Sequence, residues 1–229
     1  AGACLNDIWN VTERVDYHSS PAIKECTSAI LEKANCSTKD IEYFDIYSCF
    51  PSAVQIAMKE IGINPKDKRD LTVTGGLPYF GGPGNAYVLN SMASMIEKLR
   101  QNKGKFGMVT ANGWYLTKHG AGIFSSTPCL GEWNQVVDSS NLQKKINEIS
   151  HPEFIERADG KASIETYTIV NSREGPKRGI IIGRLDNGKR FLANTNKDKK
   201  LLTKMMEKEM LDTKGKVKFE NGKNIFEPV

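Results

Sequence analysis

The sequence has no long hydrophobic run, which argues against a membrane-spanning helix. No window offers the about 18 consecutive apolar residues that such a helix requires. The first residues, 1–7, combine neither a basic segment nor an apolar core, so they are not typical of a signal peptide. Because the chain also starts without methionine, we expect a fragment or a processed product.

Cysteine and histidine are too few and too scattered for a disulfide scaffold or a metal site. The five cysteines are an odd number and include no Cys-x-x-Cys pair. The histidines His18, His119 and His151 lie far apart and show no spacing typical of metal ligands. We therefore expect no bound metal and a location in the reducing cytoplasm.

Two glycine motifs that bind nucleotide phosphates are also missing, although the chain does contain a glycine-rich loop. Residues 75–87 read Gly-Gly-Leu-Pro-Tyr-Phe-Gly-Gly-Pro-Gly-Asn-Ala-Tyr. No Gly-Lys-Ser or Gly-Lys-Thr follows, and the glycine spacing differs from the dinucleotide fingerprint. The loop comes after an apolar segment and before a helical pattern. Since glycines allow a close approach of backbone to ligand, we expect this loop to bind something.

The order of the apolar segments predicts a layered α/β fold for residues 1–130. Apolar residues recur at helical spacing in three segments, 20–34, 52–61 and 86–100. Short apolar runs predict four strands, at 43–47, 71–74, 106–110 and 121–127. This alternation is typical of helices packed on a mixed sheet.

The composition and the hydrophobic pattern change after residue 130. Residues 131–161 are polar and predict a connector with at most a short helix. Residues 162–229 contain alternating strand patterns, Asn-Gly turns at 187–188 and 221–222, and one helical segment at 199–210. These features predict a small antiparallel β-barrel domain similar to an OB fold.

The formal charge of +5 comes mainly from lysines late in the chain, at 197–200 and 214–218. A solvated lysine-rich surface is the simpler interpretation. The alternative is contact with phosphates, either of nucleic acid or of a nucleotide-bearing cofactor. Sparse aromatic residues and interleaved acidic residues weigh against nucleic acid as the partner.

Three segments, in this order, resemble the thiolase superfamily. The first is 40–50, where Cys49-Phe50 is similar to the end of the His-Asp-Cys-Phe motif of the sterol-carrier-protein branch, while Tyr47 and Ser48 depart from it. The second is the glycine loop, in which Gly81-Gly82-Pro83 stands where the family has Gly-His-Pro. The third is 109–122, which resembles the Cys-x-Gly-Gly-Gly loop but has no cysteine near Ala111.

The resemblance covers about residues 20–127 and only the C-terminal half of a thiolase. The most similar subgroup is thiolase-like, is often labelled acetyl-CoA acetyltransferase, and carries an extra C-terminal β-domain. The resemblance implies acyl transfer on coenzyme A, with coenzyme A or acyl-CoA as substrate and no covalently bound cofactor. It also implies that the half supplying the nucleophilic cysteine is a missing partner, and it leaves open a homo-oligomer.

The family's activating histidine corresponds to Gly82 and its acid/base cysteine to Ala111, and neither side chain can move a proton. Three nearby residues are candidate catalytic substitutes: His119, Asn112 and Cys49. Each also has a plain structural interpretation, as a packing histidine, a turn former and a buried thiol. The resemblance and the loop together suggest these substrate-binding residues: Gly75, Gly76, Tyr79, Phe80, Gly81, Gly82, Pro83 and Gly113.

Two functions follow as hypotheses. The chain is either part of an acyltransferase completed by the N-terminal half, or a thiolase scaffold that binds acyl-CoA or a partner protein without catalysis. An oligonucleotide-binding module in residues 162–229 is a third alternative from a different class.

Overall fold

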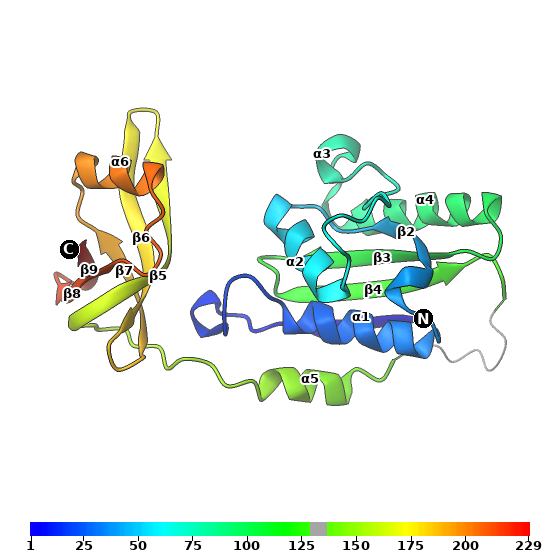
Figure 1. Ribbon diagram of the computed structural model, residues 1–229, viewed down its shortest axis with the longest axis horizontal. Helices are drawn as coiled ribbons and strands as arrows, with labels where there is room; N and C mark the ends of the chain where they lie inside the picture. The colour runs from blue at the N-terminus through cyan, green and yellow to red at the C-terminus, as the bar shows by residue number, and fades with distance from the viewer. Residues whose placement is uncertain (129–136) are drawn as a thin grey trace. The chain divides into compact units, whose positions relative to one another are not determined.

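The computed structural model describes residues 1–128 and 137–229, so Cys129 and the start of the expected connector lie outside the described residues. The chain divides into two compact units. The first contains residues 1–9 and 18–149, and the second contains residues 10–17 and 150–229. Figure 1 labels the helices and strands of both. None of the helices in the described part of the chain is long and apolar enough to span a membrane.

The first unit is built on a mixed sheet of four strands, in the order β1-β4-β3-β2. The strands are β1 (Gly2–Asn6), β2 (Ile41–Asp45), β3 (Phe106–Gly113) and β4 (Lys118–Ser125). Strands β2 and β3 are parallel, whereas the β1–β4 and β4–β3 pairs are antiparallel. The mixed sheet of the predicted fold is thereby confirmed.

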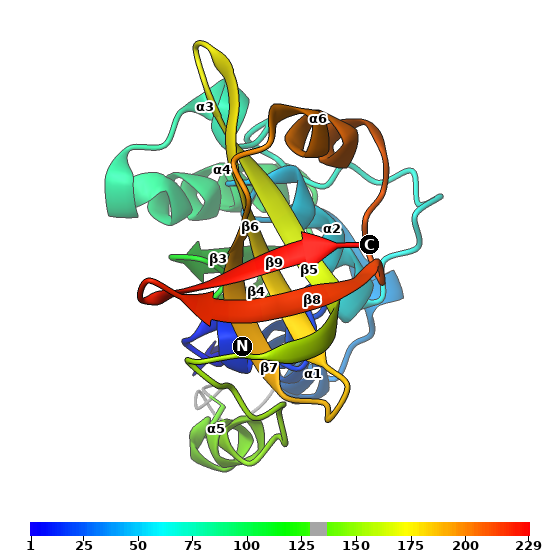
Figure 2. The ribbon, with the colours of Figure 1, turned by 90° about the vertical axis from the view of Figure 1, so that its left-hand side faces the viewer.

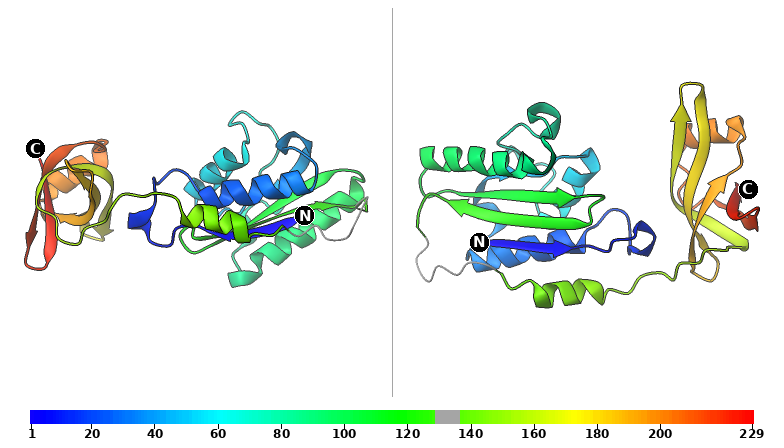
Figure 3. Two further views of the ribbon diagram at one scale, coloured as in Figure 1. Left: turned by 90° about the horizontal axis from the view of Figure 1, so that it is seen from below. Right: turned by 180° about the vertical axis from the view of Figure 1, so that it is seen from behind.

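Helices cover both faces of this sheet (Figure 3). Helices α1 (Pro21–Lys33) and α2 (Pro51–Ile61) pack on one face, and α4 (Tyr87–Gln101) packs on the other. Helix α1 starts where the sequence predicts, because the Ser20 side chain accepts a hydrogen bond from the backbone N–H of Ile23. The short helix α5 (Ser140–Asn147) places Ile146 against α1 and β1.

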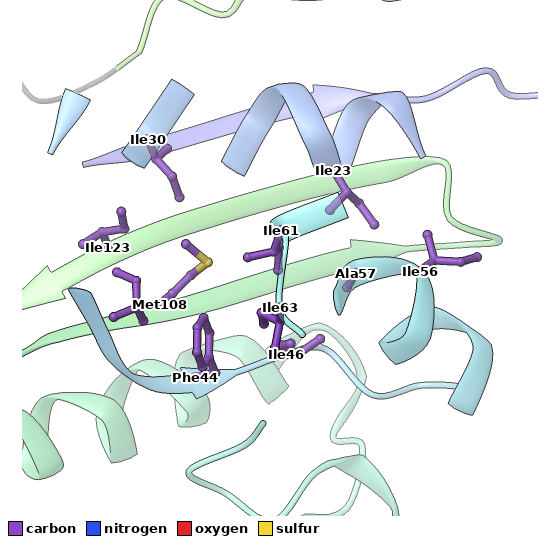
Figure 4. Packing of buried hydrophobic residues seen from close by; sticks show 11 residues of the cluster. Ile23, Ile30, Phe44, Ile46, Ile56, Ala57, Ile61, Ile63, Met108 and Ile123 are labelled. Carbon is purple, nitrogen blue, oxygen red and sulfur yellow. The ribbon is translucent and has the colours of Figure 1, made fainter. Parts of the chain in front are cut away.

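The main core lies between the sheet and the α1–α2 layer (Figure 4). Ile30 of α1 and Ile61 of α2 face Phe44 and Met108, and all four are at most 4% exposed. Burial of such side chains contributes about 1.5–3 kcal/mol each, so this layer anchors the strands that carry the candidate site.

Two sequence-based expectations about strands are wrong. Residues 71–74 form no strand, because the backbone N–H groups of Val73 and Thr74 donate to the Asp45 carboxylate instead of to a neighbouring strand. The bounds of the strands expected at 106–110 and 121–127 are also wrong, since β3 continues through Asn112 to Gly113 and β4 already begins at Lys118. Strand β1, which no pattern predicted, pairs with β4.

The second unit contains the predicted OB-like barrel, seen in Figure 2. Its closed order is β5-β6-β7-β9-β8, formed by β5 (Gly160–Ser172), β6 (Gly175–Leu185), β7 (Arg190–Thr195), β8 (Lys214–Glu220) and β9 (Lys223–Pro228). Neighbouring strands are antiparallel except β7 and β9, which are parallel. Helix α6 (Lys199–Glu207) joins β7 to β8 and buries Leu202 and Met205, of which Met205 packs in the barrel core.

Residues 10–17, although early in the sequence, fold with this barrel. The guanidinium of Arg190 is 0% exposed and donates to the backbone carbonyls of Thr12 and Arg14. It also binds both carboxylate oxygens of Glu165, at 2.8 Å and 2.6 Å. Burial alone would raise the pKa of Glu165, but the hydrogen bonds from Arg190 and Arg184 lower it overall. A buried ion pair therefore attaches a distant segment to the barrel.

Candidate functional site

The glycine loop begins with two glycines in a backbone conformation that other residues rarely adopt. Gly75 and Gly76 have φ of 89° and 87°, and a Cβ on Gly76 would lie 2.8 Å from the Ser48 hydroxyl oxygen. That hydroxyl accepts a hydrogen bond from the backbone N–H of Leu77, at 2.9 Å. Only glycine combines this φ with so close an approach, so the loop starts with a defined fold. The short helix α3 (Leu77–Phe80) follows.

The tip of the loop is exposed. Tyr79 is 85% exposed and Phe80 is 43% exposed. Residues 81–84 are exposed as well. At Gly82 a Cβ would meet only Leu77, at 3.6 Å, which is an ordinary contact. Of the predicted substrate-binding residues of this loop, Gly75 and residues 79–83 are thus accessible, whereas Gly76 is buried. Gly82 leaves open space where the family has a side chain.

A buried carboxylate holds the base of the loop, and sequence reasoning missed its role. Asp45 is 0% exposed and accepts hydrogen bonds from the backbone N–H groups of Val73 and Thr74 and from the Thr74 hydroxyl. Its other oxygen accepts from Ser91, at 2.8 Å, and from Tyr87, at 3.3 Å. All these donors are neutral. The aspartate in an otherwise apolar strand pattern was the available signal, because buried charges are rare unless hydrogen-bonded.

The turn after β2 joins the glycine loop to the end of β3. Ser48 receives the hydrogen bond from Leu77, and the next residue, Cys49, receives one from the Asn112 side chain, with 3.2 Å between Nδ2 and Sγ. Tyr47 donates its backbone N–H to the Thr110 hydroxyl, at 2.9 Å. Two predicted site residues, Cys49 and Asn112, are therefore in contact, and adjacent residues connect them to the predicted loop.

Aromatic side chains strengthen this junction. The rings of Tyr47 and Phe80 both pack edge-on against Tyr87, with centroid distances of 5.4 Å and 5.9 Å. Desolvation raises the pKa of Tyr47 and of Tyr87, so both phenols stay protonated at neutral pH. The junction offers hydrogen-bond donors and apolar surface rather than a base.

The β3–β4 hairpin places Asn112 directly opposite His119, on the same face of the sheet. Gly113, the remaining predicted substrate-binding residue, pairs with Lys118 just before the turn. The Oδ1 atom of Asn112 is buried and has no hydrogen-bond partner among the described residues. An unpaired buried oxygen is costly, so this atom is a candidate acceptor for a ligand donor or a water molecule.

His119 lies in β4 and not in a loop, which corrects the expectation from the resemblance of residues 109–122 to a family loop. It is only 6% exposed, and its Nε2 lies 3.4 Å from the Ser20 hydroxyl oxygen. The Ser20 hydroxyl in turn donates to the carboxylate of Asp7, at 2.5 Å. These contacts tie β4 to the start of α1, which agrees with the packing interpretation of this histidine.

A small cavity separates these side chains from the α1–α2 layer. Its volume is about 20 Å³, and its polar lining comes from Thr27, Tyr47, Thr110, Asn112 and His119. This volume suits one water molecule but is far below the about 300 Å³ of a typical small-molecule pocket. An acyl chain therefore does not enter the unit here, and a ligand would contact the exposed loop instead.

Burial also raises the pKa of Cys26, which lines this cavity, to about 12, and this makes the thiol a poor nucleophile.

Comparison with known proteins now assigns the fold. Residues 141–222 match the family described as thiolase-like protein type 1 additional C-terminal domain. A solved structure, the monomeric SCP2-thiolase-like protein type 1 from Mycobacterium smegmatis, matches with a TM-score of 0.88 and 35% sequence identity. The match covers 100% of this chain and 49% of that chain. The chain belongs to the thiolase-like family. The sequence matches none of the curated proteins.

This thiolase-like chain thus spans about half the length of its structural relative. Among the residues that the structure describes, no group of histidine, cysteine, aspartate or glutamate side chains could hold a metal ion. What the site offers is an exposed glycine loop, the Cys49–Asn112 pair and a buried carboxylate beneath them.

Proposed function

We propose that this chain is the C-terminal part of a thiolase-like protein that binds an acyl thioester of coenzyme A without performing thiolysis by the thiolase mechanism. One observation carries the proposal. Consecutive residues, Ser48 and Cys49, join the glycine loop to Asn112 through two hydrogen bonds. This junction is a preformed binding surface because the loop and the β3 end contact the same turn.

The missing proton carriers support binding rather than thiolysis. Thiolysis requires a base that activates the nucleophile and an acid or base at the α-carbon of the acyl group. Gly82 and Ala111 occupy the positions where the family resemblance expects these groups. The hydrogen bond that Cys49 receives comes from an amide, which cannot accept its proton at neutral pH.

The chain's own groups suit a thioester ligand. The Nδ2 group of Asn112 has a second N–H besides the one that it gives to Cys49, and this N–H can donate to a thioester oxygen. Tyr79 and Phe80 supply exposed aromatic surface for an apolar chain. Since the cavity of about 20 Å³ is too small for an acyl group, the missing half would have to enclose the rest of the ligand.

The test combines an activity assay with a binding assay on the full chain. We expect no turnover with acetoacetyl-CoA and free coenzyme A, because each missing proton carrier typically removes about 10²–10⁴ in rate. In calorimetry with acetyl-CoA, Gly82→Leu should lower affinity at least about tenfold by filling the open space at the loop tip, a loss of about 1.4 kcal/mol. Gly82→Ala is the matched control and should bind almost normally. Turnover by the chain alone, or equal binding by wild type and Gly82→Leu, would contradict the proposal.

A second candidate function is acyl transfer by the protein completed with its N-terminal half. The Asn112–Cys49 contact favours it, because it places a thiol beside a hydrogen-bonding amide. Cys49→Ala should then abolish activity of the completed protein, whereas His119→Ala lowers activity only if His119 replaces the lost acid or base. The free thiols of Cys4, Cys26, Cys36 and Cys49 suit a protein of the reducing cytoplasm, which we include in the proposal.

A further inference from the structure

The barrel has a groove that the thioester site does not use. Two adjoining hollows of about 470 Å³ and 400 Å³ share three lining residues, Arg178, Asn194 and Lys223. They are therefore parts of one groove, which crosses the outer face of β6, β7 and β9. Each hollow alone has the size of a small-ligand site, so the whole groove suits a longer ligand.

The groove is lined by cations without counter-ions. Its four basic residues are exposed and form no ion pair within the described residues: Lys177, Arg178, Lys197 and Lys223. Elsewhere on the barrel, Arg184, Lys189 and Lys218 are each paired with a glutamate, while others such as Lys161 and Lys204 form no ion pair within the described residues. What distinguishes the groove is that four such cations line one hollow. Among the described lining residues, Glu156 is the acidic one. Unpaired cations gathered in one hollow attract a ligand with several negative charges.

Apolar and aromatic side chains form the rest of the lining. Ile180 and Leu192 lie on the floor, and Leu192 is 45% exposed. Two partly exposed phenylalanines, Phe154 and Phe219, also line the groove, and the Arg157 guanidinium lies 5.1 Å from the Phe219 ring centroid. Phenylalanine rings and arginine planes are surfaces on which bases stack, whereas a ligand of phosphates alone gains nothing from them.

From this combination we infer that the groove binds single-stranded nucleic acid, a few nucleotides long, with phosphates on the four cations and bases against the apolar floor. Residues 150–229 carry 17 lysine or arginine residues against 12 aspartate or glutamate residues, so the barrel as a whole attracts a polyanion. A mononucleotide would use only part of the groove and part of the cations. The inference concerns the barrel alone and does not depend on the proposed thioester site.

The experiment measures fluorescence anisotropy of a labelled single-stranded 12-nucleotide oligomer, as DNA and as RNA, with the full chain. Four phosphate contacts predict a slope of log K against log salt of about −2.8, which is a roughly 50-fold loss of affinity between 50 and 200 mM salt. Coenzyme A, ADP and duplex DNA serve as competitors. Each should displace the strand only at much higher concentration.

Charge-reversal variants locate the site. Arg178→Glu with Lys223→Glu should halve the salt slope and lower affinity at 50 mM salt by at least tenfold. The control, Lys204→Glu with Lys208→Glu on exposed positions of α6 and its C-terminal end, changes net charge equally but should bind the strand almost normally. Circular dichroism should show both variants folded, since all four side chains are exposed.

Three results would overturn the inference. One is the absence of salt-dependent strand binding by the wild type. A second is an equal loss of affinity in the groove variant and the control. A third is coenzyme A, ADP or duplex DNA binding as tightly as the strand, which would assign the groove to a different phosphate ligand.

Discussion

In the part of the chain that the structure describes, the α/β unit and the barrel each bury one charged side chain completely, and they stabilise it in different ways. Asp45 of the first unit is surrounded by neutral donors from residues 73–74 and from α4. Arg190 of the barrel instead meets an opposite charge, Glu165, together with backbone carbonyls of residues 12–15.

This difference separates two roles for a buried charge. The donors to Asp45 flank the glycine loop on both sides, so this carboxylate fixes the candidate binding site. The acceptors of Arg190 come from a segment far away in sequence, so this guanidinium attaches that segment to the barrel. Loss of Asp45 should therefore loosen a site, whereas loss of Arg190 should release a segment and leave Glu165 with Arg184 as its remaining ion-pair partner among the described residues.

The largest loss in the free energy of unfolding is expected for Arg190→Ala. Removing one partner of a buried ion pair typically costs about 3–5 kcal/mol. Here Glu165 would keep only the partly exposed Arg184, and the carbonyl groups of Thr12, Arg14 and Val15 would lose their donor. Hydrogen-exchange mass spectrometry should show faster exchange in residues 10–17 and in β5. Arg184→Ala is the control, since Arg184 binds the same glutamate but its side chain is 34% exposed, and it should cost at most about 1 kcal/mol. Equal hydrogen exchange in the two variants would contradict the claim that Arg190 attaches residues 10–17 to the barrel.

A smaller loss in the free energy of unfolding is expected for Asp45→Asn. The amide keeps the shape of the carboxylate but turns an NH₂ group toward donors, which leaves buried donors unpaired at about 1–3 kcal/mol. Hydrogen exchange should accelerate in residues 73–87, while the barrel strands keep their protection. Uniform acceleration across the first unit would instead assign Asp45 a general core role.

Gly76→Ala should lower the free energy of unfolding by about 1–2 kcal/mol. The backbone at Gly76 has φ of 87° and ψ of 165°, a region almost restricted to glycine. The new methyl group would also displace the Ser48 hydroxyl from Leu77. Gly82→Ala lacks both problems and should be almost neutral in urea unfolding. Similar midpoints for the two variants would show that the loop does not need the Gly76 geometry.

The smallest effect is the pH dependence of stability that Glu165 contributes to the barrel. The pKa of Glu165 is lower in the folded protein than its ordinary value of about 4.3. Its contribution to stability is therefore full above that value and is lost as the pH falls through the lowered pKa. Thermal unfolding between pH 6 and pH 2 should show this loss, and Glu165→Gln should remove that part of the pH dependence. An unchanged profile in the variant would contradict the assignment.

Much of the fold could be predicted from periodicity. Helices α1, α2 and α4 have regular apolar faces, and the Asn-Gly turns mark the barrel hairpins. Strand β1 could not be predicted, because Gly2 and Ala3 have weak strand propensity and pair only through the distant β4. The attachment of residues 10–17 to the barrel depends on Arg190, 175 residues or more away, and no local pattern reports such a contact.

The candidate site was predicted in part. Motif resemblance indicated the glycine loop, Cys49 and Asn112, which the structure connects through Ser48. It could not reveal that β4 buries His119 beside Ser20, because the strand register decides which side chains face the core. The network around Asp45 depends on donors from three separate segments, so it also required the folded chain.

The central claim is that the glycine loop, Cys49 and Asn112 form one binding surface, and amide chemical shifts test it most directly. In a titration of the ¹⁵N-labelled chain with acetyl-CoA, the amides of Gly76, Gly82, Cys49 and Asn112 should shift together and give one dissociation constant. Gly82→Leu should weaken all four responses to the same extent. Shifts limited to one of these segments, or different dissociation constants for the loop and for Asn112, would contradict the shared surface.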